Sequence, residues 1–301
     1  MVLKVKRRTS EKVFNVFNIV FMILLCIVTI YPYINQLAIS FNEGHDAMRG
    51  GVTVWPRVFT LENYKAVFTS QDFGSAVTVS VLRVIIYTLL SLFVVYSAAY
   101  GLTRKGIPFR KGITMFLMIP SYISAGVIPT YLLYRYYHLI NNFWVYILPS
   151  AFIFYNMVIM RSFLQDIPES IEESAKVDGA NDIIIMFKIM IPLSLPVIAT
   201  VALWSAVGAW NDWTTTLMFV TDREKFTLQY LMMRLIKESE IAQQMAIQSA
   251  MNGGSDAKIA QPTSESVKSA TLIVSTIPII LVYPFLQRYF IQGVTVGAVK
   301  G

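Results

Sequence analysis

The sequence contains little charge and almost no cysteine. Only 14% of its 301 residues are charged, against roughly a quarter in a typical soluble domain, and 55% are hydrophobic. Cys26 is the single cysteine, so a disulfide framework within one chain is excluded. Its place inside an apolar run predicts a packing or lipid-facing thiol. The composition therefore indicates an integral membrane protein rather than a soluble domain.

Sequence patterns for catalysis and metal binding are also missing. No Gly-x4-Gly-Lys-Ser/Thr loop for ATP occurs in the sequence, so a chemical energy source would have to lie on another chain. His45 and His138 are the two histidines, and neither has metal-ligand spacing, so we interpret both as surface groups. No nucleophile–base pair can be identified. We therefore predict no catalytic residue, no metal ligand and no cofactor on this chain, and we do not expect an enzyme.

The net charge of +7 could indicate a nucleic-acid-binding protein. However, the basic residues are dispersed near the ends of apolar runs instead of gathering on one face, which membrane topology explains better. A membrane-spanning helix needs about 20 mostly apolar residues. Six runs meet this requirement, at about 13–40, 75–103, 112–134, 143–163, 193–217 and 270–290. The sequence therefore predicts an all-α integral membrane fold with six transmembrane helices.

The first run begins behind a basic segment, as a signal peptide does. It continues through Ile39 without a small-residue cleavage site, which favours an uncleaved anchor. The loop 104–111 holds four basic residues and no acidic one, and basic loops lie on the cytoplasmic side. With an even number of spans, both termini are then cytoplasmic. The predicted segments are a cytoplasmic N-terminus 1–12, a transmembrane domain 13–292 with an inner loop 164–192 and outer loops 41–74 and 218–269, and a cytoplasmic tail 293–301.

The inner loop 164–192 has the pattern of two short helices separated by a turn. Pro168 suits a helix start, and the acidic residues that follow it complement the helix dipole. Gly179 can end this helix, and Asn181 can cap the next one. We expect a helix–turn–helix along the cytoplasmic membrane face, placed where it can contact a partner protein.

Within this loop, Glu173-Ser174-Ala175 is followed by Gly179 and, after nine further residues, by Ile189-Met190-Ile191-Pro192. This pattern resembles the motif of binding-protein-dependent ABC importer permeases that couples them to their ATPase. Ser174 and Ile191 depart from it, in place of alanine and leucine. The resemblance implies a set of ATPase-coupling residues: Glu172, Glu173, Ser174, Ala175, Asp178, Gly179, Ala180, Ile189 and Pro192.

The resemblance extends over nearly the whole chain. Trp55-Pro56, the segment 59–64, the Trp-Asn-x-Trp pattern at 210–213 and the tail 287–301 are similar to the oligosaccharide branch of these permeases. The nearest resemblance is to the smaller six-span permease of the maltose system. It implies a type I ABC importer transmembrane fold in the bacterial cytoplasmic membrane and alternating access. The implied partners are a second permease forming a heterodimer, two ATPase subunits that bind ATP and magnesium, and an external sugar-binding protein contacted at Asn252, Gly253 and Gly254.

A candidate substrate path consists of polar and aromatic residues in the second and fifth predicted spans: Arg83, Trp210, Asn211, Asp212 and Trp213. Charges at membrane depth tend to face cavities, and aromatic rings can stack on sugars. We hypothesise that Arg83, as a lone arginine in a span, favours an acidic, uronate-containing oligosaccharide. Arg83 could instead reach the outer interface, and the tryptophans could form an interfacial belt. Two other functions stay open: a permease for a non-sugar solute, and an ATP-independent channel.

Overall fold

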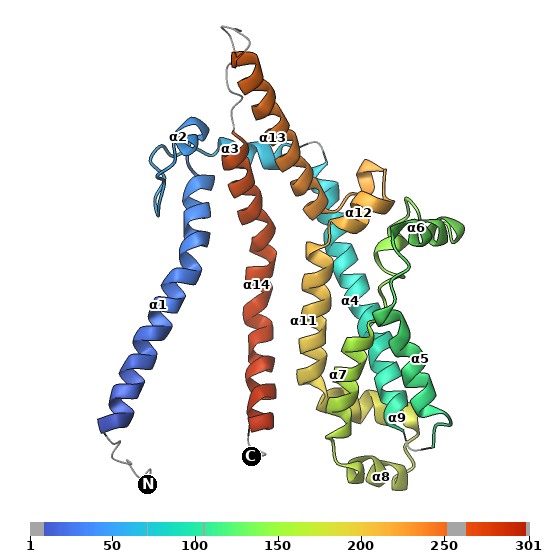
Figure 1. Cartoon of the computed structure of the whole chain (residues 1–301). Helices are drawn as coiled ribbons and strands as arrows, with labels where there is room; N and C mark the ends of the chain where they lie inside the picture. The colour runs from blue at the N-terminus through green and yellow to red at the C-terminus, as the bar shows by residue number, and fades with distance from the viewer. Residues whose placement is uncertain (1–8, 71, 105, 252–262, 299–301) are drawn as a thin grey trace. The chain divides into compact units, whose positions relative to one another are not determined.

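The computed structural model describes residues 9–70, 72–104, 106–251 and 263–298 (Figure 1). These residues form helices and connecting segments, with one isolated antiparallel bridge between Asn42 and Phe59. The predicted all-α fold is therefore confirmed. The chain divides into two compact units, Met1–Ser70 with Arg234–Thr276, and Gln71–Met233 with Ile277–Gly301.

The first unit contains α1 (Thr9–Ser40), α2 (Gly44–Met48) and α3 (Glu62–Phe68), with parts of α13 (Leu228–Met251) and α14 (Ser264–Ala298). The buried Asn42 side chain organises the loop after α1. Its Oδ1 accepts hydrogen bonds from the backbone N–H groups of Arg57 and Val58 at 2.8 and 2.9 Å, while its Nδ2 donates to Asp46 at 2.9 Å.

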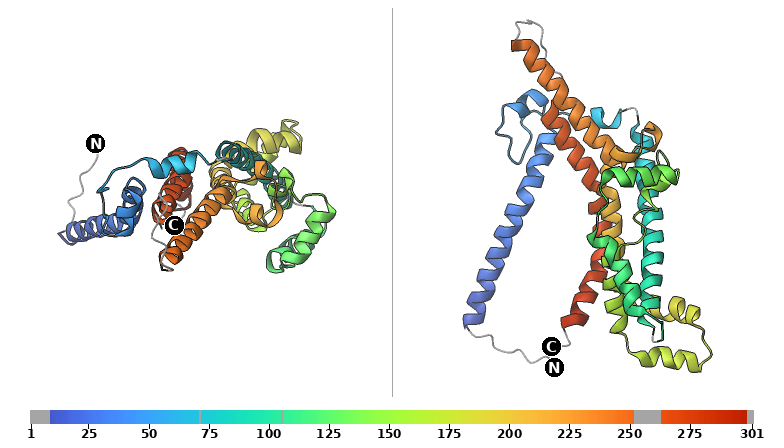
Figure 2. Two further views of the ribbon diagram at one scale, coloured as in Figure 1. Left: turned by 90° about the horizontal axis from the view of Figure 1, so that it is seen from above. Right: turned by 45° about the vertical axis from the view of Figure 1, so that its right-hand side comes forward.

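Twelve elements lie in the second unit: α4 (Phe73–Thr103), α5 (Arg110–Tyr122), α6 (Val127–Tyr136), η1 (Phe143–Tyr146), α7 (Phe154–Gln165), α8 (Glu169–Val177), α9 (Asp182–Ile185), the π-turn η2 (Met186–Met190), α10 (Ile191–Leu193), α11 (Leu195–Asn211), α12 (Thr214–Phe219) and η3 (Arg223–Lys225). Helix α4 packs against α7 and α11 (Figure 1). The small Ala99 permits close approach at this contact, beside the fully buried Met157, Met160 and Val201. Figure 2 shows α8 and α9 at one end of this packed layer, and α12 lies at the other.

Many apolar side chains are uncovered in the single chain, as expected for a protein whose solvent is lipid. Helix α1 is the extreme case, since none of its most apolar 18-residue stretch is buried. Among the described residues, α1, α4 and the Ser264–Pro284 part of α14 are long and apolar enough to cross a membrane. Two bent helix pairs raise this number to as many as five if each pair counts as one span.

The third and fourth predicted spans do not form single straight helices. The run at 112–134 is broken between α5 and α6, which are bent by 115°, because Ile123 is extended and Gly126 has φ +84°. The run at 143–163 contains η1 and then α7, which has 12 residues. A helix of that length extends about 18 Å, whereas the hydrocarbon core is about 30 Å thick.

The fifth predicted span, 193–217, also differs from a straight helix. α11 ends at Asn211, because Asp212 is extended, and α12 follows as a separate short helix. At its other end, α11 makes an angle of 81° with the helix Asp182–Leu193 that precedes it. The hydropathy pattern thus located apolar segments correctly but did not reveal their breaks.

Candidate functional site

The segment 164–192 has the predicted helix–turn–helix form. Helix α8 follows Pro168, and Gly179 adopts φ +83°, a left-handed conformation that glycine tolerates. The turn is closed by the Ala180 N–H, which donates to the Ala175 carbonyl at 2.9 Å. The Asn181 side chain then caps α9 by accepting from the Ile184 N–H at 2.8 Å. Both short helices and their turn are therefore as expected from the residues.

The predicted coupling residues fall on different surfaces of this segment. Those that are exposed are Glu173, Ser174, Asp178, Gly179 and Pro192, and those that are half-buried are Glu172, Ala180 and Ile189. Ala175 is 8% exposed and packs into the core shared with α4 and α7. Its small side chain is explained by packing within this chain, whereas the family resemblance placed it among the ATPase-coupling residues.

The segment also presents large apolar side chains that the sequence interpretation did not single out. Val177 is 88% exposed, Ile183 is 67% exposed and Phe187 is 49% exposed. Exposed apolar groups next to charged ones are typical of protein-interaction surfaces. The apolar run 183–187, which follows the charged first half of this loop, is the signal that could have indicated part of this surface.

Glu172 on α8 forms an ion pair with Arg104, the residue that follows α4. Burial raises the pKa of the Glu172 carboxyl above its ordinary value and lowers the pKa of the Arg104 guanidinium, because each charged form loses contact with water. The attraction between the two opposite charges offsets their loss of hydration. It holds the first coupling helix against the end of α4.

A cavity of about 1100 Å³ opens in the second unit, on the half of α4 that is remote from α8. Residues of α4, α5, η1, α7, α11 and α12 line it, together with the segment 149–153. Aromatic side chains dominate its wall: Tyr87, Phe116, Tyr122, Tyr146, Phe152, Phe154, Tyr155 and Trp204. The rings of Tyr155 and Trp204 stack with their centroids 6.2 Å apart, and both side chains are exposed. Such a wall suits a ligand with both apolar and hydroxyl-bearing faces, because aromatic groups supply large contact areas.

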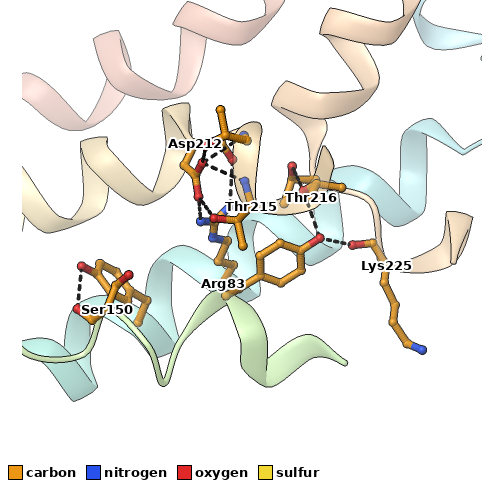
Figure 3. Close-up of polar contacts among 10 residues, drawn as sticks. Arg83, Ser150, Asp212, Thr215, Thr216 and Lys225 are labelled. Carbon is orange, nitrogen blue, oxygen red and sulfur yellow. Dashed lines mark hydrogen bonds and ion pairs between the residues drawn. The ribbon is translucent and has the colours of Figure 1, made fainter. Parts of the chain in front are cut away.

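Arg83 and Asp212 contribute the charged groups among the described residues that line this cavity. They form an ion pair, and Arg83 Nη1 donates to the Asp212 carbonyl at 2.9 Å (Figure 3). The guanidinium also lies 4.6 Å from the centroid of the Tyr146 ring, whose hydroxyl donates to the Lys225 carbonyl at 2.8 Å. Asp212 in turn accepts from the Thr214 N–H and so begins α12.

Arg83 lines the cavity, as predicted, but it is not an isolated charge. It is 4% exposed, and its charge is balanced by Asp212. Of the other predicted path residues, Asp212 lines the cavity, whereas Trp210, Asn211 and Trp213 are absent from its wall. Trp210 is 8% exposed, and Asn211 donates to the Val207 carbonyl at 3.0 Å. The predicted binding-protein contacts Asn252, Gly253 and Gly254 lie outside the described residues.

Comparisons with known proteins agree on one family. The family described as binding-protein-dependent transport system inner membrane component matches residues 108–296. The polygalacturonan/rhamnogalacturonan transport system permease protein YtcP of Bacillus subtilis (strain 168) is 34% identical, over 97% of this chain and 100% of its own length. Protein LplC of the same organism is 35% identical, over 97% of this chain and 96% of its own length.

A solved structure of a bacterial ABC transporter involved in the import of the acidic polysaccharide alginate has a similar chain. It is 26% identical, with a TM-score of 0.81, over 95% of this chain and 100% of that one. This similarity confirms the type I ABC importer permease fold. The relatives are transport permeases, not enzymes. The chain belongs to the family of binding-protein-dependent transport system inner membrane components.

Proposed function

We propose that this chain is the permease subunit of an ATP-driven importer that moves an oligosaccharide through the membrane by alternating access. The observation that carries the proposal is that a candidate partner-binding surface and a cavity lie on the same packed layer of helices. One end of α4, α7 and α11 bears the helix–turn–helix with its exposed apolar face, and the remote half of the layer holds the aromatic cavity. Such an arrangement can link a partner protein to a substrate path.

The proposed topology has six spans with both termini in the cytoplasm of a bacterium. In that orientation the loop 104–111 with its four basic residues and the segment 164–192 both lie inside. The broken runs 112–134 and 143–163 would cross the membrane as helices combined with extended segments. Irregular backbone at membrane depth is tolerated where it lines a cavity, and the segment 149–153 does line one.

The proposed partners are a second permease, two ATPase subunits and an external sugar-binding protein. The exposed surface of the segment 164–192, with Glu173 and Val177, would contact the ATPase. The uncovered apolar faces of α1 and of the other long helices would contact lipid and the second permease. Residues 252–254 would contact the binding protein, as the family resemblance implies.

The proposed substrate is an acidic oligosaccharide, which the names of a pectin-related permease and of an alginate importer support. The described wall of the cavity offers stacking surface but no net charge, because Arg83 and Asp212 neutralise one another. Selection of an acidic sugar would therefore reside in the binding protein or in the second permease, while this chain contacts the rings of the sugar.

The test is co-purification of the ATPase with the permease pair, followed by ATP-dependent uptake in proteoliposomes. We expect Glu173→Lys to reduce both, because it reverses a charge on the exposed face of α8. Glu62→Lys on α3 is the matched control, since it reverses an exposed carboxylate outside the segment 164–192. Undiminished ATPase binding and uptake in Glu173→Lys would contradict the proposal. Uptake without any ATPase would favour the channel alternative.

A further inference from the structure

Three residues at a spacing of four lie near the end of α4 that contacts the segment 164–192, which we call the coupling segment: Tyr96 and Tyr100 within the helix, and Arg104 directly after its last residue. Residues four apart lie above one another on one helix face. The rings of Tyr96 and Tyr100 are nearly parallel, at 9°, with centroids 6.5 Å apart. The Arg104 guanidinium lies 4.1 Å from the Tyr100 ring centroid. These three side chains therefore form one continuous stack, which we call the α4 ladder.

The Tyr96 end of the ladder reaches the end of the coupling segment that leads into α11. The Tyr96 hydroxyl lies 3.4 Å from the hydroxyl of Ser194. Ser194 is fully buried and occupies the bend of 81° between the coupling segment and α11. This contact fixes α4 to the point at which the direction of the chain changes.

Tyr100 and Arg104 hold the two coupling helices. The Tyr100 hydroxyl donates to the carbonyl of Asp182, the first residue of α9, at 3.3 Å. Arg104 pairs with Glu172 of α8, and its Nη2 lies 3.6 Å from the Asp182 carboxylate. A single guanidinium thus contacts acidic groups from both helices of the helix–turn–helix.

The Arg104 contacts are largely shielded from water. The side chains of Arg104 and Glu172 are 18% and 20% exposed, so water screens their attraction only in part. By comparison, Lys176 pairs with Asp182 at 3.7 Å, but these side chains are 53% and 65% exposed. Exposed pairs of that kind contribute little. Arg104 is consequently the principal ionic link between the coupling segment and α4 among the described residues.

We propose that the α4 ladder positions the coupling segment on α4 and transmits its displacement to the cavity, with Arg104 as the main positioning residue. The inference rests on the proposed ATP-driven function. Arg83 of the cavity lies on α4, 20 positions before its last residue Thr103, or about 30 Å along the axis at 1.5 Å per residue. A displacement of α8 and α9 by the ATPase would pull on Arg104 and Tyr100. Because α4 is one continuous helix, this pull would also move the Arg83–Asp212 pair on its other half.

The experiment measures sugar uptake per ATP hydrolysed for the complete transporter in proteoliposomes, with its binding protein. We expect Arg104→Ala to retain the ATPase subunits and ATP hydrolysis, while uptake per ATP falls about fivefold or more, the lower part of the usual range for coupling between sites. Arg104→Lys keeps the charge but loses the planar contact with Tyr100, so an intermediate ratio is expected. Lys111→Ala is the matched control, because Lys111 is an exposed cation near the same end of α4 and is outside the ladder.

Glu172→Gln is a second variant, which removes the ionic link to Arg104 while keeping the shape of the side chain. If Arg104→Ala fails to assemble, this variant tests the role of the ladder instead. We expect its uptake per ATP to fall as well. A ratio unchanged from the parent in Glu172→Gln, or in an assembled Arg104→Ala, would overturn the role of the ladder. Absence of an ATPase from the parent preparation contradicts the proposed function itself, so the two failures are distinguishable.

Discussion

Arg83 carries a positive charge into a largely buried site beside Asp212 and the Tyr146 ring. Its side chain is 5% exposed, and the Asp212 side chain that pairs with it is 25% exposed. Removing one partner of a buried pair leaves an uncompensated charge, which costs about 3–5 kcal/mol. Asp212 also anchors the first turn of α12 through Thr214 and Thr215. The pair therefore stabilises the half of the helical layer that is remote from α8, in addition to lining the cavity.

We predict that Arg83→Met lowers the free energy of unfolding by about 3 kcal/mol or more. The double variant Arg83→Met/Asp212→Asn should be more stable than the single one, since the asparagine keeps an oxygen that can accept from the Thr214 and Thr215 N–H groups without leaving a charge unpaired. Arg234→Met is the control, because the exposed Arg234–Glu238 pair contributes only about 0.3–0.5 kcal/mol. Thermal unfolding of the purified protein in detergent measures all three. Equal stability of the Arg83 single variant and the parent would contradict the assigned role of the pair.

Among the elements, those set by local chemistry could be predicted from the sequence. Pro168, Gly179 and Asn181 each act within a few residues of themselves, and α8, the turn and α9 form as expected. The helix Leu228–Met251 also follows from its residue pattern. The breaks at Gly126 and Asp212 could not be predicted, because hydropathy averages over a long window and a single residue changes it little.

The site was only partly predictable for a related reason. The spacing of Glu173, Gly179 and Pro192 predicts the position of the coupling segment through its resemblance to the family motif. The Arg83–Asp212 pair joins residues 129 positions apart, so only the packed structure reveals that the arginine is neutralised. Trp204 and Tyr155 likewise meet across α11 and α7, and an apolar context conceals both in the sequence.

The turn of the coupling segment provides a prediction at the scale of the element. A β-branched residue at Gly179, which has φ +83°, would be strained by at least about 1–2 kcal/mol. We expect Gly179→Val to change the relative orientation of α8 and α9 and to reduce ATPase co-purification. Gly112→Ala is the matched control, since Gly112 lies inside α5 and an added Cβ would meet no atom within 4 Å. If the two variants bind the ATPase equally well, the turn does not set the coupling surface.

For the whole molecule, the account depends on which side of the membrane the coupling segment faces. The proposed cytoplasmic location rests on the basic loop 104–111 and on the family resemblance, two independent arguments. Helix length alone leaves the number of spans ambiguous because of the two bent helix pairs. The described residues contain between three and five candidate spans. Direct determination of sidedness is therefore more informative than further counting.

The most direct test is labelling of single cysteines in cells with a thiol reagent that does not cross the membrane. Cys26→Ser provides a background without cysteine, into which Val177→Cys and Trp55→Cys are introduced separately. The parent side chains are 88% and 81% exposed, so both new thiols should be reactive where the reagent can reach them. The account predicts that the Trp55→Cys variant is labelled in intact cells. It predicts that the Val177→Cys variant is labelled only after the membrane has been opened and the complex has been dissociated. Labelling at position 177 in intact cells would contradict it.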